Sequence, residues 1–98
     1  MNISHHVAAI EEIVAAAEYF NEQDLGLGGR FVSAIDQAVR EIAGSPLAWP
    51  QSEHGTRKRI LISPFPYTIY YKSLDDRIVI IAVAHQSRQP EYWKDRIN

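Results

Sequence analysis

Cysteine is absent from the 98-residue sequence, which excludes a disulfide framework and thiolate-ligated metal sites. No apolar run approaches the roughly 20 residues that a membrane-spanning helix needs. The first residues, Met1 to His6, carry neither the basic stretch nor the apolar stretch of a signal peptide. From the length and these absences we expect a single domain, residues 1–98, that works in the cytoplasm without a membrane partner.

Motifs that would identify common cofactor and catalytic sites are also missing. His5 and His6 are adjacent, but no acid or further histidine stands at metal-ligand spacing from them. Gly26, Gly28 and Gly29 do not follow a strand at the spacing of a phosphate-binding loop. The sequence has no Gly-x-Ser-x-Gly element for a hydrolase nucleophile. We therefore expect no metal and no cofactor.

Acidic residues outnumber basic residues in the first half of the chain, and basic residues outnumber acidic residues in the second half. Residues 1–56 hold two arginines against eight acidic residues, a net charge of −6. Residues 57–98 hold eight lysines and arginines against four acidic residues, a net charge of +4. Such a split indicates a nucleic-acid or acidic-protein partner, or it reflects solvated acids on helices and basic side chains on strand edges.

The first half of the sequence has the apolar spacing of two amphipathic helices. The first helix should end near Gln23, and its apolar stripe consists of Ile10, Ile13, Val14, Ala17 and Phe20. Asp24 is the expected N-cap of the second helix, whose apolar positions are Phe31, Ile35, Ala38 and Ile42. Gly44-Ser45-Pro46 should end that helix, because glycine suits the position after a helix and proline cannot continue it. The short link predicts an antiparallel helical hairpin.

Glycine and proline mark the irregular parts of the first half. Gly26, Gly28 and Gly29 fall in the first turns of the second helix, where each costs about 1 kcal/mol relative to alanine. They either fray the helix or allow the two helices to approach closely. Residues 44–56 contain two glycines and two prolines and are expected to form a loop. Within this loop we interpret Trp49 as a plug over the edge of the core.

The second half of the sequence has the period of two that is typical of strands. Arg57 to Ile62 and Tyr67 to Lys72 alternate, and Ser63-Pro64-Phe65-Pro66 separates them. Arg77 to His85 is continuously apolar in its middle, which favours the centre of a sheet. Asn2 to Ser4 can add a short first strand. The fold class is therefore α+β, with the N-terminal antiparallel helical hairpin packed on one face of a twisted antiparallel sheet.

Basic side chains and a histidine gather around this predicted sheet. Arg57 and Arg59 alternate onto one face of their strand, with Lys58 on the other. His85 and Arg88 follow the end of the central strand. Because the end of the third strand of a meander approaches the first, we expect the arginine pair, His85 and Arg88 to line one concave surface opposite the helices. Such a surface suits phosphate or an acidic protein.

These residue types can be assembled into a site that cleaves RNA. Attack by a ribose 2′-hydroxyl needs a general base, a general acid and cations for the developing charge. His85 or Tyr92 would transfer protons, and Arg59 and Arg88 would stabilise charge. In the alternative interpretation His85 is hydrogen-bonded scaffold, the arginines protect a sheet edge, and Tyr92 with Trp93 closes the end of the core.

Short motifs run in order along nearly the whole chain. In the first half they are Tyr19-Phe20, Leu27-Gly28 with Phe31, and Pro46. In the second half they are the basic strand Arg57 to Ile62, Phe65-Pro66-Tyr67 with Ile69 and Tyr71, and the ending from Ile80 to Trp93 with Arg96. This ordered set resembles the RelE/ParE superfamily of toxins from type II toxin–antitoxin systems, which includes plasmid-stabilisation proteins.

The resemblance implies a small toxin that is held inactive by an antitoxin encoded beside it. Family antitoxins commonly wrap an extended or helical segment around the toxin, and the basic sheet face is the expected contact here. A heterotetramer or larger complex with the antitoxin would follow. The complex would repress its own promoter through the DNA-binding part of the antitoxin.

The family divides by activity. RelE-like members cleave mRNA in the ribosomal A site without a metal, whereas ParE-like members bind and inhibit DNA gyrase. The Phe-Pro-Tyr element and the His-x-x-Arg-x-Pro-x-Tyr-Trp ending are closer to the ParE-like group, and the modest content of lysine and arginine points the same way. We predict a ParE-like gyrase inhibitor, with an endoribonuclease or a non-toxic family member as alternatives. By position, the candidate site residues are Arg57, Lys58, Arg59, His85, Arg88 and Tyr92.

Overall fold

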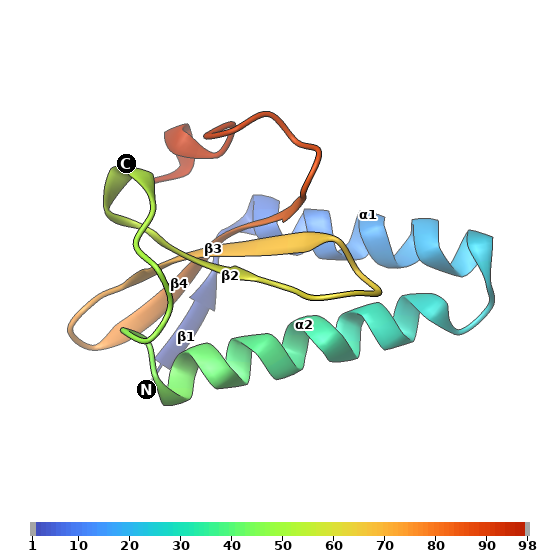
Figure 1. The fold of residues 1–98 in the computed structure, drawn as a ribbon, viewed down its shortest axis with the longest axis horizontal. Coiled ribbons are helices and arrows are strands. Elements are labelled where there is room, and N and C mark those ends of the chain that lie inside the picture. Colours follow the sequence, from blue (N-terminus) through green and yellow to red (C-terminus); the bar gives the residue numbers. More distant parts are fainter. Residues whose placement is uncertain (1, 98) are drawn as a thin grey trace.

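Two helices and a four-stranded sheet make up the protein, of which the computed structural model describes residues 2–97 (Figure 1). In chain order these elements are β1 (Asn2–His5), α1 (Val7–Gln23), α2 (Leu27–Gly44), β2 (Arg57–Ile60), β3 (Tyr67–Ser73) and β4 (Arg77–His85). Short 3₁₀ helices lie at Glu53–Gly55 and Lys94–Arg96. The hairpin of α1 and α2 packs on one face of the sheet, so the predicted α+β fold is confirmed.

The sheet has the strand order β1-β4-β3-β2 and is mixed rather than wholly antiparallel. The predicted antiparallel meander of β2, β3 and β4 is present. The short first strand is also present, and it adds a parallel edge to β4, from Asn2 opposite Arg77 to His5 opposite Ile80. A parallel pair needs a long connection between its strands. The helical hairpin and the first two meander strands supply that connection, so the prediction of a purely antiparallel sheet is wrong.

Helix α1 buries only part of the predicted stripe: Ile13, Ala17 and Phe20 pack against the core, but Ile10 and Val14 do not. Ala9 and Ala16 are buried, whereas Ile10 and Val14 are 48% and 51% exposed. The distance between packed elements depends on the side chains at the contact, so alanines allow α1 to lie close to the sheet and to α2. Ile10 and Val14, the two larger residues, remain at the outer border of the buried face of α1. Even with this apolar border, no helix in residues 2–97 is long and apolar enough to cross a membrane.

The turn between the helices is built differently from the prediction. Helix α1 ends where expected, but Asp24 is its C-cap and does not cap α2. The residue before α2 is Gly26, whose φ of 92° is strained for other residues. The Asn21 side chain accepts hydrogen bonds from the backbone N–H groups of Gly26 and Gly28 at 3.2 and 2.8 Å. The first turn of α2 is therefore capped from the neighbouring helix.

Gly28 marks the closest approach of the two helices. A Cβ atom at this position would lie 2.3 Å from the carbonyl oxygen of Ala17. Close helix contact, rather than fraying, is therefore the correct interpretation of this glycine. Helix α2 ends at Gly44 as predicted, and the backbone N–H of Ser45 donates to two carbonyl groups of the last turn.

The helix-facing side of the sheet holds the larger core. Four aromatic residues cluster at one end of it, with contacting ring centroids 4.9–6.0 Å apart, namely Phe20, Phe31, Phe65 and Tyr67. Trp49, in the loop after α2, packs against the same core as a partly buried residue, as the plug interpretation predicts. One apolar interior is thus shared by both helices, by β3 and β4, and by the link between β2 and β3.

A smaller apolar cluster lies on the opposite face of the sheet. It consists of Ile81, Ala82 and Trp93, with partly buried neighbours around them. Tyr70 pairs with Ala82 and the next residue pairs with Ile80, so Ile81 is an extra residue in β4. An extra residue of this kind is a β-bulge, which changes the direction of side chains along a strand. The residues after β4 cross over this face and cover it with Trp93.

Candidate binding site

The predicted arginine pair lies on the helix-facing side of the sheet. Arg57 stands opposite Tyr71 in the β2–β3 register, and Tyr71 belongs to the helix-facing core. The guanidinium of Arg57 donates to the backbone carbonyls of Leu47 and Trp49 at 3.2 and 2.8 Å. Arg57 therefore fastens the loop after α2 to the sheet, and it does not reach the opposite face.

Arg59 is paired on the same side. Its guanidinium donates to Glu41 of α2 at 2.7 Å and lies 4.3 Å from the ring centroid of Trp49. The hydrogen bond from Arg59 lowers the pKa of Glu41. The prediction that both arginines join His85 and Arg88 on one surface opposite the helices is therefore wrong. Strand alternation kept the arginines together, but only the register decides which face they share.

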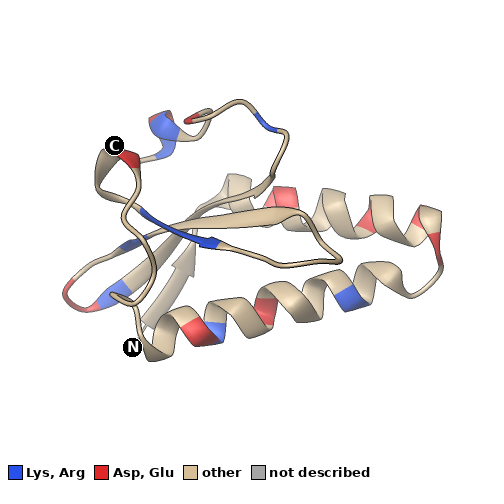
Figure 2. Cartoon of the chain, viewed as in Figure 1, with Lys and Arg blue, Asp and Glu red and all other residues tan. Residues whose placement is uncertain are grey.

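Lys58 lies on the other face of β2, where it stands opposite Tyr70. The charge split of the sequence is visible in the fold (Figure 2). Acidic residues occur along both helices, and basic residues occupy β2. Because the basic residues of β2 point alternately to the two sheet faces, Lys58 is the one among them that places its charge on the face opposite the helices.

A pocket of about 320 Å³ lies between that face and the segment after β4. Residues 86–97 will be called the C-terminal segment. The pocket walls from the sheet are Ile60, Thr68, Tyr70 and Ala84, and those at or after the end of β4 include His85, Arg88, Pro90, Tyr92 and Trp93. The structure thus brings together three of the predicted site residues, namely His85, Arg88 and Tyr92.

His85 is exposed at the end of β4, with its ring edge-on to Tyr67 at 5.3 Å between centroids. Its Nδ1 atom accepts a hydrogen bond from the backbone N–H of Ser87 at 3.0 Å, and the Ser87 hydroxyl lies 2.7 Å from the same atom. Because Nδ1 acts as an acceptor here, the neutral ring carries its proton on Nε2. His85 therefore presents an N–H donor on its free side.

Arg88 is the candidate whose charge is free for a partner. Its guanidinium stacks over the ring of Tyr92, 3.8 Å from the centroid. No carboxylate within residues 2–97 forms an ion pair with it. A guanidinium on an aromatic ring keeps its donors at the rim, where they can bind a carboxylate or a phosphate.

Tyr92 has its hydroxyl group engaged elsewhere. The hydroxyl donates to Oε2 of Glu12 at 2.6 Å. Burial of the tyrosine and its hydrogen bond to Glu12 together raise the pKa of Tyr92 far above its ordinary value. Near neutral pH the hydroxyl stays protonated and bound to Glu12, which suits an attachment point better than a proton carrier.

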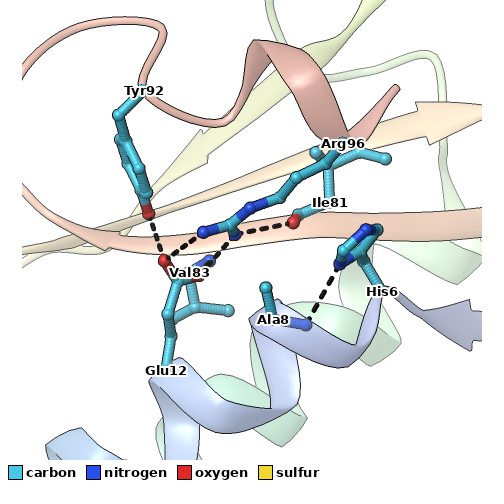
Figure 3. A network of polar contacts seen from close by, with 7 residues as sticks. All are labelled: His6, Ala8, Glu12, Ile81, Val83, Tyr92 and Arg96. Carbon is cyan, nitrogen blue, oxygen red and sulfur yellow. Dashed lines mark hydrogen bonds and ion pairs between the residues drawn. The ribbon is translucent and has the colours of Figure 1, made fainter. Parts of the chain in front are cut away.

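Glu12, which sequence reasoning missed, organises a polar network between α1, β4 and the C-terminal segment (Figure 3). Arg96 donates to both oxygens of Glu12, at 2.9 and 3.0 Å, and Tyr92 donates to Oε2. The backbone N–H of Val83 donates to Oε1 at 3.0 Å. Burial raises the pKa of Glu12, but the hydrogen bonds from Arg96, Tyr92 and Val83 outweigh burial and the pKa is lowered overall. In the sequence Glu12 stands between Glu11 and Ile13, and no local pattern distinguishes it from the neighbouring glutamate.

The pocket gathers only part of the predicted catalytic set. The pocket offers an N–H donor from His85, a free guanidinium from Arg88 and apolar walls. Two of the other predicted cations, Arg57 and Arg59, are engaged on the far side of the sheet. Residues 2–97 also hold no group of three acidic or histidine side chains that could share a metal ion.

Comparisons with known proteins identify a family and similar solved structures. Residues 3–90 match the family model described as the ParE toxin of the type II toxin–antitoxin system parDE. A solved structure described as the chromosomal ParDE toxin–antitoxin system from P. aeruginosa superposes with a TM-score of 0.64 at 13% identity, over 87% of this chain and 95% of that one. At that identity the likeness shows the fold alone. Curated protein sequences give no match. Because the family model spans most of the chain, the protein belongs to the ParE toxin family of type II toxin–antitoxin systems.

Proposed function

We propose that this toxin acts by binding a protein target, DNA gyrase, in the cytoplasm. A toxin of such a system has a cognate antitoxin as its partner, and we propose that the antitoxin neutralises it. One observation carries the choice of binding over cleavage, namely the division of the candidate residues between the two faces of the sheet. Arg57 and Arg59 lie on the helix side, whereas His85 and Arg88 line the pocket on the other.

Cleavage of RNA would need these groups around one phosphate. The reaction requires a base, an acid and cations that all lie within reach of the reacting atoms. Arg59 is neutralised by Glu41, and the hydroxyl of Tyr92 is bound to Glu12. Of the two residues predicted to transfer protons, only His85 keeps its ring free at the pocket. This inventory supports recognition of a partner rather than acid–base catalysis.

The pocket suits an acidic side chain presented by another protein. Arg88 has a free guanidinium, and Lys58 adds positive charge on the same sheet face. Ile60, half exposed at the edge strand, gives an apolar border. Interfaces obtain most of their affinity from a few arginine and aromatic residues that are surrounded by apolar contacts. Arg88 on Tyr92 has that character.

The first experiment compares two activities of the purified protein. It is added to gyrase acting on relaxed plasmid, and separately to a translating ribosome extract in which mRNA integrity is followed. We expect supercoiling to be lost while mRNA stays intact. Cuts in ribosome-bound mRNA that disappear in His85→Ala would instead establish the endoribonuclease alternative. A lack of effect in both assays, together with normal growth on expression, would establish a non-toxic family member.

The second experiment tests the residue that carries the binding. Arg88→Ala should raise the half-inhibitory concentration against gyrase by about tenfold, the effect of one moderate hot-spot residue. Arg40→Ala removes an exposed arginine from α2 and serves as the matched control. Equal inhibition by wild type and Arg88→Ala would remove this pocket from the proposal. The proposed heterotetramer or larger complex is tested by measuring the mass of the toxin co-purified with its antitoxin.

A further inference from the structure

The edge of β4 loses its strand neighbour halfway along. β1 pairs with β4 only as far as His5 opposite Ile80, and the backbone N–H of His6 makes the last bond to Ile80. Beyond that point side chains take the place of a strand. Glu12 accepts from the Val83 N–H at 3.0 Å, and Arg96 donates to the Ile81 carbonyl at 3.1 Å. The Glu12–Arg96 pair thus supplies hydrogen-bond partners for the backbone groups of β4 that have no neighbouring strand.

The C-terminal segment depends on such side-chain contacts for its position. Its backbone bonds to the body of the protein through Gln86, whose N–H donates to the Pro66 carbonyl. The later backbone bonds are local ones within the segment or to its neighbour His85. Burial of Trp93 against Tyr70 holds the middle of the segment. How the residues between Gln86 and Trp93 are oriented must therefore be decided by side chains.

Two polar contacts can supply that orientation, and their burial distinguishes them. His54 contacts Glu91 at 2.6 Å, but both side chains are more than 40% exposed. The side chains of Glu12 and Arg96 are only 16% and 17% exposed. Exposed pairs contribute little, whereas removing one partner of a buried pair leaves an unpaired charge. The contacts of Glu12 are therefore the stronger constraint on the segment.

The constraint reaches the pocket through Tyr92. Glu12 fixes the hydroxyl end of Tyr92 at 2.6 Å, and the ring of Tyr92 is the surface on which Arg88 stacks at 3.8 Å. Glu12 itself does not line the pocket. Three residues from α1 and the C-terminal segment thus form a chain of contact that ends at the free guanidinium.

We propose that Glu12 is a positioning residue for the Arg88 site: it holds Tyr92 in the orientation that places the Arg88 guanidinium at the pocket, so that target binding depends on a carboxylate located on α1. The proposal rests on the proposed binding function for its activity readout. It makes a separate structural claim about Arg88 that does not depend on any target.

The activity test uses two conservative variants and a neighbouring control. Glu12→Gln keeps the shape but removes the charge, and Tyr92→Phe keeps the ring but removes the hydroxyl. Each should raise the half-inhibitory concentration against gyrase roughly fivefold or more. Glu11→Gln, an exposed neighbour on α1, should match wild type. Wild-type inhibition by both Glu12→Gln and Tyr92→Phe overturns the proposal.

A double-mutant cycle separates positioning from general damage. If Glu12 acts through Arg88, the Glu12→Gln/Arg88→Ala protein should inhibit no more weakly than Arg88→Ala alone. Multiplication of the two separate losses would mean that Glu12 acts on another part of the surface, and it would overturn the proposal. Thermal unfolding of each variant in a single transition confirms that the compared proteins are folded.

A measurement without any target keeps the two proposals distinguishable. Protons of the Arg88 side chain lie over the Tyr92 ring, so their NMR signals should be shifted upfield by the ring. We expect Glu12→Gln to remove most of that shift and Glu11→Gln to preserve it. An unchanged shift overturns the positioning role even if gyrase is inhibited. A lost shift in a protein that never inhibits gyrase supports the positioning role and rejects the target.

Discussion

The two faces of the sheet are covered in different ways. The helix side is covered by α1 and α2, and its interior joins residues from helices, strands and the loop with Trp49. The opposite side is covered by an irregular segment, in which Trp93 packs over Ile81 and Ala82. Many residues share the burial on one side, while a few directed contacts hold the cover on the other.

The two faces should therefore respond differently to mutation. Burial of apolar area is non-directional, so the helix side should respond to lost volume and should unfold as one unit. The contacts of Glu12 are directional, so the segment side should respond to lost charge or geometry and should open locally. The candidate pocket lies on the second side, beside the cover that these directional contacts hold.

The largest effect is expected from a cavity on the helix side. Phe31 is fully buried and contacts the rings of Phe20, Phe65 and Tyr67. Phe31→Ala should lower the free energy of unfolding by about 3–5 kcal/mol, through lost burial and the cavity left behind. Denaturant unfolding measures it, with Leu25→Ala, 92% exposed, as the control. A loss below about 1 kcal/mol would mean that this face is not the dominant core.

Next in size is the contact between the two helices. Gly28→Ala would place a Cβ 2.3 Å from the Ala17 carbonyl, and we expect a loss of about 1–3 kcal/mol from the resulting shift. Gly29→Ala is the matched control, because no atom lies within 4 Å of its Cβ. There alanine should stabilise the helix by about 0.5–1 kcal/mol. Changes of opposite sign in the free energy of unfolding would locate the helix contact at Gly28. Equal changes for the two variants would contradict that location.

The helix side is also the side that the sequence predicted well. Apolar spacing gave both helices and the meander, because regular elements repeat their buried positions at a fixed period. The errors there are local. Ile10 and Val14 were assigned to the core from their apolar spacing, whereas Ala9 and Ala16 occupy it because close helix contact favours small residues. Asp24 was assigned as a cap on residue type, whereas the turn needed the positive φ of Gly26.

The candidate site was predictable only in part. His85 and Arg88 were found from their place after a buried strand, and the structure puts both at one pocket. Arg57 and Arg59 were placed on the wrong face, because a one-residue change of register reverses every side chain of a strand. The contact between Glu12 and Arg96 joins positions 84 residues apart, and no local pattern encodes it. Irregular segments lack the period on which such reasoning depends.

Acid should weaken the segment side selectively. The pKa of Glu12 is lowered in the fold by its hydrogen bonds, so its contribution is present above the unfolded pKa and is lost as pH falls through the folded one. Wild type should therefore lose stability relative to Glu12→Gln as pH falls below about 4.5, by less than the cavity effect. Urea unfolding across this range measures the difference. A difference that stays constant with pH would show that the carboxylate is not the titrating group.

The smallest effect is expected from an exposed ion pair whose distance is similar to that of the largely buried Glu12–Arg96 pair. Arg40 and Asp36 are 2.7 Å apart, one turn apart on α2, with side chains 73% and 56% exposed. Asp36→Asn should cost only about 0.3–0.5 kcal/mol, and less in high salt, because water and ions screen an exposed pair. Urea unfolding at low and high salt measures it. Glu12 makes contacts of similar length with Arg96, at 2.9 and 3.0 Å, yet both side chains are largely buried, so Glu12→Gln should cost more and depend less on salt. Equal costs for the two variants would mean that burial does not distinguish these pairs, and the structural reason for assigning control of the C-terminal segment to Glu12 would be lost.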